Sequence, residues 1–146
     1  MKRLLLAAAA LVISLAPVAA QNLDVIKERK EIFKSFGPHA QAGAAMVRGE
    51  APFDLDRAKA IFAAYVQGAG QLPDLFPDDS KEGGETEALP VIWERKSEFV
   101  AGFEKLELDA GAAFDAVTDL DSFRTNWGTV MGNCGTCHRA FRLQKN

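Results

Sequence analysis

The sequence has few metal-binding side chains, with only two cysteines and two histidines in 146 residues. A zinc site takes about four such ligands, so the composition argues against a zinc protein. The net charge is −3, and without a cationic excess the chain gives no case for nucleic acid or an anionic membrane as a partner. Internal repeats, low-complexity tracts and strand-like alternation are also absent from the sequence. These absences leave a helical protein of one domain.

The N-terminal apolar run, residues 4–15, is too short and wrongly flanked for a transmembrane helix. Lys2 and Arg3 precede it, and small residues at 17–20 follow it, which is the pattern of a secretory signal peptide. We expect residues 1–20 to be removed and residues 21–146 to form one domain without membrane insertion. The leader predicts a periplasmic protein.

The most informative motif is Cys134-Gly135-Thr136-Cys137-His138. C-x-x-C-H is the attachment signature of c-type haem, because each thiol adds to one haem vinyl group and the histidine can bond the iron. On a helix, Cys134, Cys137 and His138 share one face, since their spacing is i, i+3, i+4. The motif therefore predicts one haem c attached through both cysteines. Attachment of such haem follows export, which agrees with the leader.

Other interpretations of the cysteine pair are weaker. A thioredoxin-like C-x-x-C follows a strand and opens a helix, whereas no strand-like alternation precedes Cys134 and only eight residues follow His138. A structural disulfide across so short a loop would leave His138 without a role.

Four stretches have helical periodicity. The first covers about residues 23–47, and we expect a kink or a break at Gly37-Pro38, because proline removes a backbone donor. The second begins at the N-cap Asp54 and stops at residues 68–70. A linker rich in Pro, Gly and Asp covers about residues 71–85, and we expect it to wrap near the haem edge.

The third helix is predicted to start between Thr86 and Pro90, and the fourth to start at residues 119–121 and run to the end. All four carry an apolar stripe. The side chains expected in these stripes include Ile26, Ile32, Phe33, Phe36, Ile61, Phe62, Tyr65, Phe99, Phe103, Phe114, Phe123, Trp127 and Phe141. We therefore expect an all-α, antiparallel four-helix bundle with the haem between helices near one end.

The chain resembles cytochrome c′, the class II cytochrome c family. In the commoner mono-haem carriers C-x-x-C-H lies near the N-terminus, whereas here it lies near the C-terminus. The order and spacing of further segments also agree with the family: residues 29–34 (RKEIFK), 48–54 (RGEAPFD), 84–88 (GETEA), Ile92-Trp93, and Arg142 four residues after His138. One departure is Phe141, where relatives often carry tyrosine.

The resemblance implies a five-coordinate iron with His138 as proximal ligand and no protein ligand opposite. Low-spin relatives place a methionine of the first helix at the position of Phe33, and phenylalanine cannot bind iron. Phe33 is then expected to lie over the open face of the haem and to make a dry pocket without a hydrogen-bond donor. The alternative is that Phe33 is an ordinary core residue.

The resemblance also implies haem contacts by four polar residues. Arg29 would approach the propionates, Thr86 and Glu87 the haem edge, and Arg142 the proximal imidazole. The alternatives are an exposed arginine on an amphipathic helix for Arg29, plain helix capping for Thr86 and Glu87, and a last-turn cation for Arg142.

Two residues could instead close the sixth position of the iron. His39 follows Gly37-Pro38, and Met46 lies ten residues after Phe36. A surface role for His39 and core packing for Met46 are the ordinary interpretations. Met131 precedes the attachment site by one turn and is poorly placed to reach the far side of the haem.

These features predict a periplasmic haem protein that binds small diatomics, nitric oxide and carbon monoxide, and can transfer electrons to a redox partner that the sequence does not identify. Nitric oxide binding or sequestration is favoured. The alternative is a simple electron carrier whose six-coordinate haem has His39 or Met46 as sixth ligand. We expect no enzyme, because no acid–base pair is visible on the distal side. A homodimer through the first two helices is compatible with the sequence.

Overall fold

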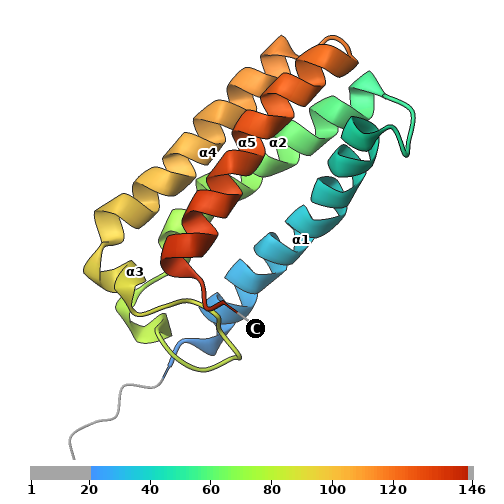
Figure 1. Ribbon diagram of the computed structural model, residues 1–146. Helices are drawn as coiled ribbons and strands as arrows, with labels where there is room; N and C mark the ends of the chain where they lie inside the picture. The colour runs from blue at the N-terminus through green and yellow to red at the C-terminus, as the bar shows by residue number, and fades with distance from the viewer. Residues whose placement is uncertain (1–20, 145–146) are drawn as a thin grey trace, which may run out of the picture.

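The computed structural model describes residues 21–144, and the predicted signal peptide lies outside them. Four long helices, α1 (Leu23–Arg48), α2 (Leu55–Gln71), α4 (Lys96–Ala116) and α5 (Leu120–Phe141), alternate in direction along the bundle (Figure 1). Within this part of the chain no strand forms beyond an isolated bridge between Ala88 and Arg142. The predicted all-α antiparallel four-helix bundle is confirmed. None of its described helices is long and apolar enough to cross a membrane.

The linker between α2 and α4 is folded rather than irregular. It contains two 3-10 turns, η1 (Leu72–Leu75) and η2 (Asp78–Ser80), and a one-turn helix, α3 (Val91–Glu94). These turns lie at the end of the bundle where α1 begins and α5 ends (Figure 1).

The prediction of one continuous third helix is wrong at its start, because Arg95 leaves helical geometry (φ −116°, ψ 43°) and separates α3 from α4. Side chains on both sides of this break bind the linker. Trp93 Nε1 donates to the carbonyl oxygens of Phe76 and Pro77, both at 3.1 Å, and Lys96 Nζ donates to that of Phe76 at 2.8 Å. Such long-range contacts are invisible in the local periodicity.

A break at Gly37-Pro38 does not occur, because α1 continues through Pro38 to Arg48. Proline removes the hydrogen bond to the carbonyl of Lys34, one turn earlier. Both Pro38 and Lys34 are solvent-exposed positions, so water can replace the lost donor at this turn.

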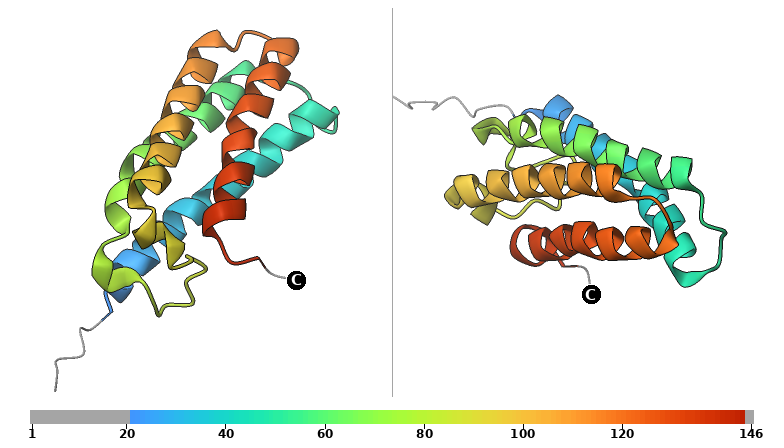
Figure 2. Two further views of the ribbon diagram at one scale, coloured as in Figure 1. Left: turned by 60° about the vertical axis from the view of Figure 1, so that its left-hand side comes forward. Right: turned by 90° about the horizontal axis from the view of Figure 1, so that it is seen from above.

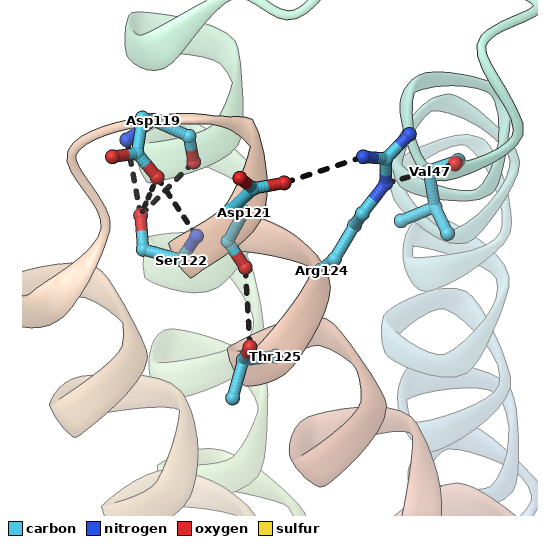
Figure 3. Close-up of polar contacts among 6 residues, drawn as sticks. All are labelled: Val47, Asp119, Asp121, Ser122, Arg124 and Thr125. Atoms are coloured by element: carbon cyan, nitrogen blue, oxygen red, sulfur yellow. Dashed lines mark hydrogen bonds and ion pairs between the residues drawn. The ribbon is translucent and has the colours of Figure 1, made fainter.

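The predicted N-cap Asp54 and the predicted start of the last helix at residues 119–121 are both confirmed. Asp54 accepts a hydrogen bond from the Arg57 N–H at 2.9 Å. At the start of α5, Asp119 and Ser122 form a reciprocal capping box (Figure 3). In the same region Arg124 Nε donates to the Val47 carbonyl at 3.3 Å, which joins the second turn of α5 to the last turn of α1.

The buried apolar residues form two clusters. One fills the bundle between the four long helices, and its members include Met46, Phe62, Tyr65, Phe123 and Trp127. The other lies where the linker closes the bundle and consists of Leu72, Phe76, Ile92, Phe99, Phe103 and Phe141. The predicted burial of Phe114 is wrong: its side chain is 36% exposed, with Lys59 Nζ 5.0 Å from the ring centroid.

Helices α1 and α5 touch near one end and separate toward the other. At Gly43 of α1 a Cβ atom would overlap the Trp127 ring of α5, so glycine permits the close approach. Seen from above, the two helices are widely separated where α1 begins and α5 ends (Figure 2, right). The C-x-x-C-H motif lies on this separated half of α5.

Candidate haem-binding site

Cys134 and Cys137 lie one turn apart on α5, both half-buried and both free thiols. Burial raises the pKa of Cys134, and burial together with the nearness of Cys134 raises the pKa of Cys137 to about 11. Reactive thiols of the thioredoxin type instead have a lowered pKa. No cluster of three or more potential metal ligands occurs in the described part of the chain. The pair therefore differs from both a redox-active pair and a zinc site.

His138 follows Cys137 directly and is exposed to solvent. Partial burial and the positive charge of Arg142 lower the pKa of His138, and the Glu87 carboxylate opposes them. A lowered pKa favours the neutral imidazole, which is the form that binds metals.

Helix α5, which carries the motif, and helix α1 both have apolar surface that the described part of the chain leaves partly uncovered. No residue of α1 between Arg29 and Gly43 is buried, and none of α5 between Val130 and Phe141 is buried. The apolar side chains in these two segments include Ile32, Phe33, Phe36, Ala40, Met131, Cys134, Cys137 and Ala140. A flat apolar group between α1 and α5 would remove this surface from water. The residues present thus fit a haem.

Phe33 is packed on one side only. Its ring centroid lies 6.3 Å from that of Phe36 and 6.3 Å from that of Phe103, while its side chain is 38% exposed. An ordinary core residue would be enclosed on all sides. The exposed part of the ring is available to a group bound between α1 and α5, and its place over the iron stays a prediction.

Arg29 is almost fully buried, at 2% exposure, and its guanidinium binds the linker. Nη1 donates to the Leu75 carbonyl (3.1 Å) and the Ser80 hydroxyl (2.9 Å). Nη2 donates to the Ser80 carbonyl (2.9 Å) and the Thr86 hydroxyl (3.0 Å). The guanidinium carbon lies 4.3 Å from the Phe76 ring centroid. The alternative of an exposed arginine is therefore wrong.

Burial lowers the pKa of Arg29 to about 10, and within residues 21–144 the hydrogen bonds recorded for its side chain all go to neutral acceptors. A buried cation is stabilised by an anion, and the propionates expected from the sequence would supply one. Both terminal nitrogens of Arg29 already donate hydrogen bonds to linker residues, so Arg29 holds the linker beside the site. Its contact with propionates stays a prediction.

Glu87 and Arg142 join the linker to the end of α5, whereas Thr86 joins the linker to α1. Thr86 Oγ1 accepts from Arg29 and from the Ala88 N–H (3.2 Å). Glu87 Oε2 accepts from Arg142 Nε at 2.8 Å. Neither Thr86 nor Glu87 caps a described helix, since the residue before α3 is Pro90. Glu87 and Arg142 lie close enough to His138 to influence its pKa, and the haem contacts of all three residues stay predictions.

The candidate sixth ligands differ in surroundings. Met46 is 1% exposed inside the first core cluster, as expected for packing. His39 is half-buried, and its ring centroid lies 6.4 Å from that of Tyr65. Met131 is half-buried against the same cluster.

Sequence reasoning missed the Tyr65 hydroxyl. The stripe of α2 correctly placed the ring in the core, where it is 1% exposed. Among the described residues, however, the hydroxyl has no hydrogen-bond partner. Its burial follows from the helical period, whereas an unpaired hydroxyl depends on contacts between three helices that no sequence pattern records.

Comparison with known proteins gives a consistent result. A family model described as Cytochrome C′ matches residues 24–142. The chain is 44% identical over 138 residues to a cytochrome c′ of Rhodopseudomonas palustris, with 94% of each chain covered. A solved structure of cytochrome c′ from Rhodopseudomonas palustris superposes with a TM-score of 0.82 at 46% identity, covering 84% of this chain and 98% of that one. A nitric oxide complex of a mutant cytochrome c prime from Alcaligenes xylosoxidans superposes with a TM-score of 0.73 at 28% identity, covering 86% and 98%.

Proposed function

The chain belongs to the cytochrome c′ family of haem c proteins, and from this premise we propose that it binds nitric oxide and carbon monoxide in the periplasm. The observation that carries the proposal is the Phe33 ring on α1, which packs against Phe36 and Phe103 but is 38% exposed. A side chain without a metal-binding atom at this position leaves one side of the iron open.

The residues of α5 would hold the prosthetic group. The Cys134 and Cys137 thiols would form its two thioether bonds, and the neutral His138 imidazole would bind the iron. When bound, the haem supplies a metal–ligand bond for the gas and a one-electron couple. Arg142, held by Glu87 at 2.8 Å, places a fixed positive charge beside the proximal imidazole.

Nitric oxide sequestration is the favoured role. Nitric oxide and carbon monoxide bind ferrous haem through metal–ligand bonding that needs little help from a pocket, so an apolar face such as that of Phe33 suits them. The Alcaligenes xylosoxidans relative, whose nitric oxide complex has been solved, supports this choice. Electron transfer is compatible with the same site. A pocket without an acid–base pair fits the binding of a gas better than its catalytic conversion.

Gas titration of the reduced protein tests the proposal. We expect one carbon monoxide and one nitric oxide bound per chain, with the same result in His39→Ala and Met46→Leu variants. A ferrous protein that binds carbon monoxide only after one of these two substitutions would contradict the proposal. That result would identify the substituted residue as a sixth ligand and favour the simple electron carrier.

A further inference from the structure

The inference concerns the seam between the linker and the end of α5. The Leu89 N–H donates to the Phe141 carbonyl at 3.0 Å, and the Leu143 N–H donates to the Glu87 carbonyl at 2.8 Å. These two hydrogen bonds flank the isolated antiparallel bridge of this region. Both are formed by the main chain, so the linker stays fixed against the end of α5 when the Glu87 side chain is changed.

The same seam places an ion pair beside His138. Arg142 lies one turn after His138, and its backbone N–H donates to the His138 carbonyl at 3.3 Å. Its side-chain Nε donates to Glu87 Oε2 at 2.8 Å. The Glu87 side chain is 29% exposed and that of Arg142 is 47% exposed. Water therefore screens this pair only in part.

The two charges of the pair act on His138 in opposite directions. Burial and the Arg142 charge lower the pKa of His138, whereas the Glu87 charge raises it. Arg139 is adjacent to His138 in the sequence, but its side chain turns back along α5 and donates to Thr136 Oγ1 at 3.3 Å. Groups around a metal-bound histidine tune its basicity and the potential of the metal.

We propose that Glu87 lowers the reduction potential of the haem iron by offsetting the positive charge of Arg142 beside His138. Glu87 is a positioning residue, since it acts through Arg142 and binds neither the iron nor the gas. The proposal rests on the proposed function, in which His138 binds the iron. Without the Glu87 charge, an uncompensated cation would remain beside the imidazole. Such a cation disfavours ferric haem, which carries one more positive charge than ferrous haem.

Redox titration of the haem-loaded protein, without any gas, tests the proposal. Glu87→Gln keeps the size of the side chain and an oxygen acceptor for Arg142, and it removes the negative charge. We expect its reduction potential to rise, so that the ferric-to-ferrous ratio at a fixed potential falls about fivefold. Arg142→Gln should shift the ratio in the opposite direction. The double variant should return close to the wild type, because the pair it removes is neutral.

A spectroscopic readout and a matched control accompany the titration. In resonance Raman spectra of the ferrous protein, the iron–histidine stretching frequency should fall in Glu87→Gln, because the uncompensated Arg142 charge makes the imidazole a weaker donor. The control is Glu85→Gln, which makes the same charge change two residues earlier in the linker, at an exposed position. We expect little change in its potential, since water and salt screen an exposed charge.

Three results would overturn the proposal. Shifts in the same direction in Glu87→Gln and Arg142→Gln would show that both substitutions merely disturb the end of α5. An unchanged potential in Glu87→Gln, or an equal shift in Glu85→Gln, would remove any special role of Glu87. Failure of the proposed function is distinguishable: it would appear as a reduced wild type that binds no carbon monoxide, whereas the potentials are measured without gas.

Discussion

At the scale of single residues, Phe33 decides how a ligand reaches the proposed open side of the iron. Its ring contacts Phe36 and Phe103 on one side and is exposed on the other. An incoming ligand must push the ring aside and lose these dispersion contacts, which are individually small but collectively costly.

Replacing Phe33 by alanine should therefore speed carbon monoxide binding and tighten it. If moving the ring costs about 1.4 kcal/mol, the gain in affinity is roughly tenfold. Stopped-flow binding to the ferrous wild type and Phe33→Ala measures both quantities. Equal rates and affinities would mean that Phe33 is a packing residue and that the open face lies elsewhere.

Arg29 determines the position of the linker. Four hydrogen bonds join its guanidinium to Leu75, Ser80 and Thr86, and a buried charged donor contributes about 1.5–3 kcal/mol per bond without strict additivity. Arg29→Met keeps an unbranched, flexible stem and removes all donors. We expect it to lower the free energy of unfolding by about 3 kcal/mol and to expose residues 71–86 to proteolysis.

Urea unfolding and limited proteolysis check the Arg29 prediction. The matched control is Lys30→Met, because Lys30 donates to the Gly84 carbonyl of the same linker at 2.7 Å but from an exposed position. We expect little change in that variant. Similar losses in both variants would show that the buried network has no special role.

At the scale of elements, the divergence of α1 and α5 creates the site, and the contact at Gly43 sets the point where they meet. A Cβ atom there would overlap the Trp127 ring. Gly43→Ala should lower the free energy of unfolding by about 1–3 kcal/mol through overpacking. Gly128→Ala is the control, since nothing lies within 4 Å of its Cβ position, and it should stabilise α5 by about 0.5–1 kcal/mol.

Thermal or urea unfolding of these two glycine variants measures the difference. Stabilisation by both substitutions would contradict the close approach of α1 and α5. A shift of the haem absorption bands in Gly43→Ala but not in Gly128→Ala would further tie the helix contact to the shape of the site.

The elements that the sequence predicts correctly are those determined by neighbours in the chain. Asp54 and Asp119 cap helices through residues three positions later, so a local pattern suffices to find them. Whether a helix continues through Pro38 depends on whether the carbonyl that loses its donor faces water. Whether a helix breaks at Arg95 depends on where the linker carbonyls lie. Local periodicity contains neither quantity. A break at Gly37-Pro38, one of the two outcomes expected there, does not occur, and the expected continuous third helix is wrong at its start.

The site shows the same division. Cys134, Cys137 and His138 are recognisable because haem attachment requires that spacing on one helix. The partners of Arg29 are 46 to 57 residues away in sequence, and the unpaired hydroxyl of Tyr65 depends on neighbours from α1 and α5. Predicting these contacts requires the packing of the bundle, not the pattern of a segment.

At the scale of the whole molecule, the haem is expected to complete the core. The second core cluster includes Phe99, Phe103 and Phe141, and half-buried Ile32 and Cys137 pack against it with one side uncovered. Replacing Cys134 and Cys137 together by alanine should abolish covalent haem and most of the stable helical fold. Either single change should do less, since one thioether still holds the group.

Circular dichroism and pyridine haemochrome spectra of the purified variants check this prediction. A double variant that accumulates as a well-folded, haem-free bundle with an unchanged helical signal would show that the haem lies outside the core.

In the proposed holoprotein the iron is bound by His138 and open on the Phe33 side. The visible absorption spectrum of the reduced protein, recorded before any gas is added, tests it most directly. We expect the broad bands of a five-coordinate, high-spin ferrous haem, which sharpen only when carbon monoxide binds. Sharp, split low-spin bands in the ligand-free protein would contradict it and point to His39 or Met46 as a sixth ligand.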